Sequence, residues 1–215
     1  MAVRPIYQSQ TDAPFFRVID VSFQYFSGFS TSQKQKSIES LHKQYNESDP
    51  DHAVLEISSK SKSELGVALS AFNLNIKTPQ QQNCSVECAF QSSKVFEGGG
   101  PYVDLLDKTS REAKKDTRLH ESGKLIAFQY FELKFPLEPK DYFYNWLYSS
   151  ALMQNQELAS EIIKYDSFSD IEFNPQKSIN CQAKAAAVFV GLSRRHLLEE
   201  AIRSPELFLN IVYGG

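Results

Sequence analysis

The sequence predicts an α+β fold that is mostly helical, in a single domain with a small β-sheet. Stretches with helical periodicity outnumber alternating ones, and no internal repeat or low-complexity linker divides the chain. Of the 215 residues, 41% are hydrophobic and 13% aromatic, which is enough apolar surface for a sizeable core. That length is long for one compact domain and short for two. We therefore expect one domain over residues 1–215, with room for an inserted strand or hairpin around 124–135.

The first half of the chain combines helical and strand patterns. Residues 33–45 repeat apolar side chains every three to four positions, which predicts an amphipathic helix. Residues 53–58 are mostly apolar and residues 72–77 alternate, so each predicts a strand. Between these two strands, the S-x-x-E motif of residues 61–64 is a capping box and predicts the start of a short helix.

The second half is dominated by helices. Ser85 is the expected cap of a helix from residue 86 to about residue 96, which the glycines at 98–100 end. We expect a further helix over 104–120 and a long strand over 124–135. The remaining helices are expected at 140–153, at 155–165, at 180–193, and after the start signature Ser204–Pro205–Glu206.

Composition excludes several classes of protein. The longest apolar run, residues 185–192, is too short to span a bilayer, and the N-terminal segment lacks the apolar core of a signal peptide. The 3 cysteines have no paired spacing, which indicates free thiols in a reducing cytoplasm. No metal or cofactor is expected, because His and Cys are scattered. A net charge of −3 argues against a protein that coats nucleic acid through bulk charge.

The segment SVECAFQSSKVF, residues 85–96, carries the strongest chemical signal. On a regular helix, Glu87, Gln91 and Lys94 would lie on one side, next to the more apolar side that holds Phe90. This stripe offers a carboxylate, an amide and an amine in a row. Periodicity alone favours the simpler interpretation, a solvated face on which Glu87 interacts with the helix dipole.

Two groups of basic residues are candidates for phosphate contacts. One group has the spacing of a single helical stripe and consists of Arg111, Lys114, Lys115 and Arg118. The other follows an aromatic run that ends at Phe29 and consists of Lys34 and Lys36, a combination that suits stacking on a base beside a phosphate. The alternatives are a solvated face with internal ion pairs for the first group, and core aromatics for the second.

Carboxylates gather in the stretch DSFSDIEFNP, residues 166–175, which has the composition of a loop. Asp170 and Glu172 are the candidates there, because loops between scaffold elements often carry catalytic groups. Aspartate is equally common as a turn former.

The order of these motifs resembles the NADAR superfamily. LSAF at 69–72, followed by Glu87, Gln91, Lys94 and Phe96, is similar to the family's LSNF and its E-H-x-x-Q-x-x-K-F helix. Residues 170–174 resemble a variant of the family's D-x-x-W-G motif, and Asn180 follows. Cys88 stands where the family has His, and Phe173 where it has Trp. Several segments are most similar to the branch found beside DNA-guanine ADP-ribosyltransferase toxins of the DarT type.

This resemblance implies an N-glycosidase that removes ADP-ribose from guanine in DNA and acts as the antitoxin. Glu87 would be an acid/base or electrostatic group, and Lys94 would attack C1 of the ribose to form a Schiff base. Direct attack by water assisted by carboxylates is the alternative, and Asp170 would orient that water or the ribose hydroxyls. The implied partners are ADP-ribosylated DNA, ADP-ribose as product, and a DarT-type toxin.

The expected binding residues extend around these three groups. Phe72, Gln91, Glu172 and Asn180 would hold the substrate, Phe29, Lys34 and Lys36 would contact its base or phosphates, and the residues of the 111–118 stripe would contact DNA. Two other functions remain open from the sequence. One is an N-glycosidase acting on a riboflavin-pathway ribosylamino-pyrimidine phosphate, and the other is a non-catalytic protein that binds a toxin or ADP-ribose.

Overall fold

The computed structural model describes residues 1–176 and 178–214, and it confirms the α+β fold class. Its largest sheet has the strand order β2-β1-β9-β3. The strands β1 and β2 form an antiparallel hairpin, β9 adds antiparallel to β1, and β3 adds parallel to β9. In chain order these strands are β1 (Ala2–Ser9), β2 (Phe16–Phe23), β3 (Val54–Glu56) and β9 (Ser167–Ser169).

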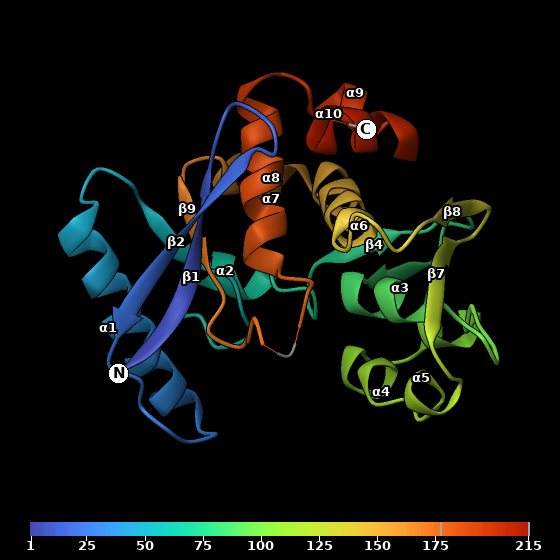
Figure 1. The fold of residues 1–215 in the computed structure, drawn as a ribbon, viewed down its shortest axis with the longest axis horizontal. Coiled ribbons are helices and arrows are strands. Elements are labelled where there is room, and N and C mark those ends of the chain that lie inside the picture. Colours follow the sequence, from blue (N-terminus) through green and yellow to red (C-terminus); the bar gives the residue numbers. More distant parts are fainter. Residues whose placement is uncertain (177, 215) are drawn as a thin grey trace.

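This sheet lies between helix α1 (Thr31–Ser48) and helix α8 (Gln182–Arg194), as Figure 1 shows. Side chains alternate along β1, so Ile6 belongs to the small core beneath α1 whereas Tyr7 belongs to the large core that contains α8. Helix α8 is built largely from small buried residues, and it therefore packs closely on both the sheet and α6 (Tyr142–Gln154).

Two small sheets and several short helices complete the fold. The sheets are β4 (Asn75–Lys77) with β5 (Asn83–Ser85), and β6 (Lys94–Phe96) with β7 (Leu125–Tyr130) and β8 (Leu133–Phe135). The helices are α2 (Glu64–Ala68), α3 (Val86–Ser92), η1 (Val103–Asp107), α4 (Ser110–Lys114), α5 (Arg118–Glu121), α7 (Gln156–Ile162), α9 (Leu198–Ala201) and α10 (Pro205–Tyr213). Of these elements, α3, α4, α5, β7 and β8 lie on the right side of Figure 1.

The predicted caps are mostly confirmed. Ser85 accepts a hydrogen bond from the backbone N–H of Cys88 at 3.1 Å and starts α3. Ser204 accepts one from the N–H of Leu207 at 3.2 Å and starts α10. The capping box at residues 61–64 is wrong, because α2 is capped by Ser63, whose side chain accepts from Gly66.

Three predicted elements differ from the structure. The helix expected over 86–96 ends at Ser92, since β6 pairs with β7 immediately afterwards. The helix expected over 104–120 is divided into η1, α4 and α5. Residues 124–135 form the two paired strands β7 and β8 rather than one long strand. In each case a turn or a strand partner interrupts a periodicity that continues in the sequence.

The hairpin β1–β2 and the strand β9 are not among the predicted elements. Pro5 lies inside β1, and proline within a run argues against a strand. Residues 167–169 lie inside the stretch that was expected to be a loop, yet they are fully buried between β1 and β3. Tertiary pairing therefore decides these strands, not local propensity.

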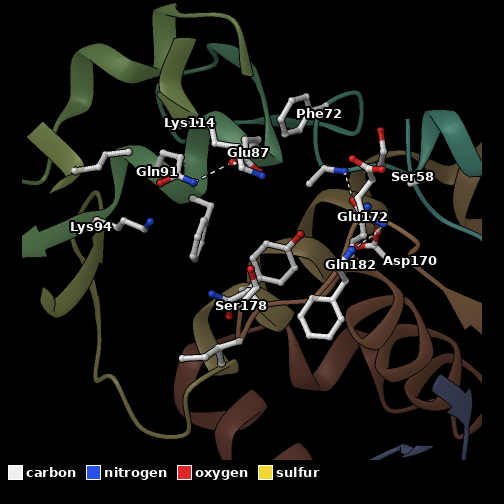
Figure 2. A pocket seen from close by; sticks show the side chains of 18 of the residues that line it. Ser58, Phe72, Glu87, Gln91, Lys94, Lys114, Asp170, Glu172, Ser178 and Gln182 are labelled. Atoms are coloured by element: carbon white, nitrogen blue, oxygen red, sulfur yellow. Dashed lines mark hydrogen bonds and ion pairs between the residues drawn. The ribbon is translucent and has the colours of Figure 1, made fainter. Parts of the chain in front are cut away.

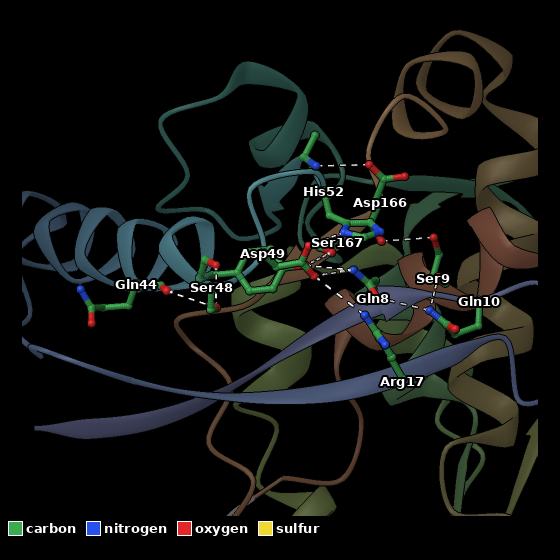
Figure 3. A network of polar contacts seen from close by, with 12 residues as sticks. Gln8, Ser9, Gln10, Arg17, Gln44, Ser48, Asp49, His52, Asp166 and Ser167 are labelled. Atoms are coloured by element: carbon green, nitrogen blue, oxygen red, sulfur yellow. Dashed lines mark hydrogen bonds and ion pairs between the residues drawn. The ribbon is translucent and has the colours of Figure 1, made fainter.

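Polar contacts tie the C-terminal half of α1 to the sheet, as Figure 3 shows. The Tyr45 hydroxyl lies 2.7 Å from Ser167 Oγ and accepts from Gln8 Nε2 at 3.1 Å. Gln8 also donates to Asp49 at 3.1 Å. The network fixes the position of β9 relative to α1.

Aromatic packing joins α3 and α6 to the strands β7 and β8. The ring of Phe143 in α6 lies 4.9 Å from that of Phe128 in β7 and 6.0 Å from that of Phe90 in α3, between centroids. Phe135 of β8 lies 4.7 Å from Phe143. This cluster fixes α3 and β7 on α6, and so it positions one wall of the cavity described below. Among the described residues, no helix is both long and apolar enough to cross a membrane.

Candidate functional site

A cavity of about 550 Å³ opens between the part of the fold that holds α3 and the sheet β6–β7–β8 and the part that holds β9 and α8. One wall comes from α3, β6, β7 and α4, and the opposite wall comes from the segment between β9 and α8. Figure 2 shows Glu87, Gln91, Lys94 and Lys114 on the first wall, facing Asp170, Glu172 and Gln182 on the second. Its size falls in the ordinary range for small-molecule sites.

Glu87 lies in the first turn of α3 and is only 6% exposed. Its Oε1 accepts a hydrogen bond from Gln91 Nε2 at 2.9 Å, across one helical turn. The ammonium of Lys114 lies 3.9 Å from the same oxygen. The start of a helix also favours a negative charge, so this carboxylate is held in place by three interactions.

Lys94 reaches the cavity from β6 rather than from α3. It pairs with Phe128 in the ladder between β6 and β7, and its Nζ lies 5.0 Å from the centre of the Phe90 ring. Loss of water in the cavity lowers the pKa of Lys94 to about 8. The Glu87 carboxylate acts in the opposite direction, and the nearby Lys114 lowers the pKa further.

The predicted face of a single helix is therefore wrong for Lys94, although the three groups still meet in one cavity. Within the part of the chain that the structure describes, the ion pair of Glu87 within 4.0 Å is with Lys114 and not with Lys94. The Lys94 amine thus lacks the direct salt bridge that would keep it charged.

The LSAF segment, residues 69–72, joins both walls. The backbone carbonyl of Ala71 accepts from the N–H of Glu87 at 2.9 Å, and the N–H of Ala71 donates to Gln182 Oε1 at 2.8 Å. Phe72 lines the cavity, and its ring lies 5.2 Å from Lys114 Nζ. This segment sets the position of Glu87 relative to the start of α8.

Asp170 follows β9 and is half-buried in the second wall. Its Oδ1 accepts from the backbone N–H of Glu172 at 3.0 Å and of Phe173 at 3.2 Å. Burial raises the pKa of Asp170, and the negative charge of Glu56 raises it further. Lys94, whose pKa is lowered, therefore lies across the cavity from Asp170, whose pKa is raised.

Some of the remaining predicted binding residues line the cavity, and others do not. Gln91, Glu172 and Asn180 line the cavity. Lys34 is outside the lining and forms an ion pair with Glu172 at 3.1 Å, so it supports the rim. Neither Phe29 nor Lys36 lines this cavity. Phe29 is fully exposed, and Lys36 lines a separate depression beside the first residue of the chain.

The predicted basic stripe is not one surface. Helix α4 ends at Lys114, and α5 begins at Arg118, so the four residues are not on a continuous helix. The guanidinium of Arg118 is paired with Asp104 at 2.7 Å and Asp116 at 2.8 Å, which neutralises it. Arg111 and Lys115 are exposed and do not line the cavity. Lys114 is a cavity residue instead of a surface contact.

Sequence reasoning missed several lining residues. Tyr144 and Phe128 resemble ordinary core aromatics in the sequence, and Gln182 is a single polar residue at the start of an alanine-rich helix. A polar side chain at the first position of a small-residue helix is a weak signal that could have indicated Gln182. His120 and Ser58 had no distinguishing context.

The two departures from the NADAR motifs have different positions. Cys88 is buried, donates its thiol hydrogen to the carbonyl of Lys108 at 3.1 Å, and does not line the cavity. Phe173 does line it. In residues 1–176 and 178–214, no three His, Cys, Asp or Glu side chains gather in a way that could hold a metal ion.

Comparison with known proteins adds to this geometry. No curated protein matches the chain. The family described as DarT1-associated NADAR antitoxin matches residues 2–215, and this span includes LSAF, the Glu87–Lys94 segment and Asp170. The resemblance to the NADAR superfamily and to its toxin-associated branch is thereby confirmed. The chain belongs to the family of DarT1-associated NADAR antitoxins.

Proposed function

We propose that this antitoxin is an N-glycosidase that removes ADP-ribose from guanine in DNA and so reverses the action of a DarT-type toxin. The observation that carries the proposal is the opposition of Lys94 and Asp170 across one cavity, with Glu87 held beside the lysine. Pairs of titratable groups whose pKa values are shifted by their surroundings are typical of acid–base sites.

Lys94 is the proposed nucleophile. With its pKa lowered to about 8, about one amine in ten is neutral at pH 7, against fewer than one in a thousand for an ordinary lysine. The neutral amine attacks C1 of the ribose, the C1–guanine bond breaks, and its electron pair leaves with the base. Ring opening then gives the Schiff base, which water hydrolyses to release ADP-ribose and the free amine.

Glu87 is the proposed electrostatic partner of this step. Positive charge develops at C1 as the base leaves, and an oriented carboxylate stabilises it. Because Gln91 and Lys114 hold the Glu87 carboxylate, it can face the ribose without forming a direct salt bridge that would stabilise the charged form of Lys94. The lowered pKa of Lys94 favours the Schiff-base route over water attack, since the water route requires no lysine of lowered pKa.

The cavity also suits a phosphorylated ligand. Lys114 is half-exposed at the mouth and lies over Phe72, which supplies an aromatic surface for a base or ribose. Lys34 supports the opposite rim through Glu172. A cation at the mouth beside an aromatic face is a common way of holding a nucleotide.

The test measures ADP-ribose release from an oligonucleotide that carries ADP-ribosyl-guanine. The wild-type protein is expected to release it, and Lys94→Met and Glu87→Gln are expected to lose release while retaining the fold. Lys115→Met is the matched control, because Lys115 is exposed and outside the cavity. A folded wild type that releases nothing would refute the proposal. Neutralisation of the toxin that survives Glu87→Gln would instead indicate a non-catalytic binder.

A further inference from the structure

A second carboxylate lies behind Asp170 and outside the cavity lining. Glu56, in β3, is only 2% exposed. Its Oε1 accepts from the backbone N–H of Ile171 at 2.8 Å, and its Oε2 accepts from the hydroxyl of Ser169. Glu56 therefore bonds to the residue before Asp170 and to the residue after it.

The bond to Ser169 continues into α1. His42 Nε2 lies 2.8 Å from Ser169 Oγ. Because the Ser169 hydroxyl donates its hydrogen to Glu56, its oxygen must accept one, so His42 carries its proton on Nε2. Burial lowers the pKa of His42 to about 4, which leaves the ring neutral at neutral pH.

The arrangement follows from two periodicities. His42 and Tyr45 are three residues apart on α1 and share one side of the helix. Ser169 and Ser167 are two residues apart on β9 and share one side of the strand. The two pairs meet side by side, with Tyr45 against Ser167 at 2.7 Å and His42 against Ser169 at 2.8 Å.

A buried carboxylate is costly, and here both of its oxygens are occupied as hydrogen-bond acceptors. Among the described residues, no cation lies within 4.0 Å of Glu56. Burial raises the pKa of both Glu56 and Asp170, and the negative charge of Glu56 raises the pKa of Asp170 further.

The hydrogen bonds decide which carboxyl keeps the proton. Both oxygens of Glu56 accept from donors, so a proton there would displace one of them. At Asp170 the two backbone N–H groups both go to Oδ1. The amide of Gln182 also bonds this carboxyl and favours its charged form, but that amide donates as well to the carbonyl of Ile57 at 2.7 Å, so Oδ2 can still carry the proton. The proton therefore belongs to Asp170, on the side of the cavity.

The other titratable groups around Asp170 do not compete. Burial raises the pKa of the hydroxyls and the thiol that face it from β1, α6 and the start of α8, so these groups are neutral: Tyr7, Tyr144, Tyr148 and Cys181. Glu172 is the other acid nearby, and its charge is offset by Lys34 at 3.1 Å. Glu56 is thus the buried charge that acts on Asp170.

We propose that Glu56 is a positioning residue which fixes the backbone on both sides of Asp170 and keeps that carboxyl protonated, so that Asp170 is the acid of the site. This inference rests on the proposed function. As Lys94 bonds to C1 from the first wall, the C1–guanine bond breaks. Its electron pair goes to the base nitrogen, and the Asp170 Oδ2 proton is transferred to the base. Asp170 is left as the carboxylate and is reprotonated from solvent.

The test is the pH dependence of kcat/KM for wild type and Glu56→Gln, with ADP-ribose release from the modified oligonucleotide as the readout. Wild-type kcat/KM should rise as Lys94 loses its proton and fall as Asp170 loses its own. In Glu56→Gln the falling limb should move by about one pH unit to lower pH, with about a tenfold loss at alkaline pH and little loss at pH 6. Glu47→Gln, on the exposed face of α1, is the matched control and should keep the wild-type profile.

A second measurement separates this inference from the proposed function. Carbon-13 NMR of the aspartate carboxyls, with Asp170→Asn to assign the signal, titrates Asp170 directly and needs no activity. A lowered pKa for Asp170 in Glu56→Gln supports the inference, and an unchanged one overturns it whether or not the wild type is active. If Glu56→Gln does not fold, Ser169→Ala replaces it. Loss of the hydroxyl donor moves the proton toward Glu56, so the falling limb shifts in the same direction by less.

Discussion

Replacement of Lys94 by methionine tests the central assignment most directly. Methionine keeps much of the packing against Phe90 and removes the amine, which lies 5.0 Å from that ring. If the amine attacks C1, kcat should fall on the order of 10³-fold, because no other group forms the covalent bond. The free energy of unfolding should change little or rise, since the variant no longer holds a desolvated cation.

The lowered pKa of Lys94 also predicts how strongly kcat/KM of the wild type depends on pH. A pKa of about 8 makes the neutral fraction of Lys94 about 1% at pH 6 and about 9% at pH 7. Deprotonation increases as pH rises, so kcat/KM should increase about ninefold over this unit, while Asp170 stays largely protonated. The assay is ADP-ribose release from the modified oligonucleotide in buffers of constant ionic strength.

Borohydride trapping adds a structural readout. Reduction during turnover should leave a covalent adduct on the wild type and none on Lys94→Met. A flat kcat/KM between pH 6 and 7 would refute the reasoning on the lysine, as would full activity of Lys94→Met. An adduct that persists in Lys94→Met would assign the nucleophile to another residue.

Three further changes test other parts of the structure. Lys114→Gln should lower kcat/KM about tenfold, because Glu87 loses the cation that lies 3.9 Å away. Lys115→Gln should leave kcat/KM unchanged, and equal effects of the two substitutions would contradict the role of Lys114 at the cavity mouth. Phe29→Ala should leave the thermal unfolding temperature unchanged, because Phe29 is fully exposed. If its ring stacks on a base, the substitution should raise KM for the modified DNA about tenfold, and an unchanged KM would show that Phe29 does not contact DNA. Gly66→Ala should lower the free energy of unfolding by about 1–3 kcal/mol in a denaturant titration, because a Cβ would lie 2.0 Å from the carbonyl oxygen of Glu56. A free energy of unfolding equal to that of the wild type would show that β3 can shift away from the added methyl group without loss of stability.

Local signals predicted the part of the site that is local in the chain. Ser85 caps α3, and Glu87 and Gln91 are one turn apart on it, so their 2.9 Å hydrogen bond follows from helix geometry. Lys94 has the same spacing pattern, but α3 ends at Ser92. Its true position depends on pairing with Phe128, which no periodicity of residues 85–96 can show.

Charge patterns were less reliable guides than caps. The spacing of residues 111–118 predicted one basic surface, but the turn between α4 and α5 separates its members. Arg118 is paired with Asp104, fourteen positions earlier in the chain, and Lys114 turns toward Glu87, which is twenty-seven positions earlier. A sequence pattern identifies charged side chains but not the partners that neutralise them.

The sequence by itself determined the α+β class, the capped helices that begin at Ser85 and Ser204, and the identity of the chemical groups at positions 87, 94 and 170. These depend on residues close together in the chain, whose geometry is set by backbone hydrogen bonds and caps. Only the tertiary structure decided that Lys94 reaches the cavity from β6 and not from α3. It also decided that Glu56 lies behind Asp170, reached through Ser169, which is 113 positions from Glu56. Such contacts and the pKa shifts they cause come from burial and from pairing between distant segments, which exist only once the sheet and both cores have formed.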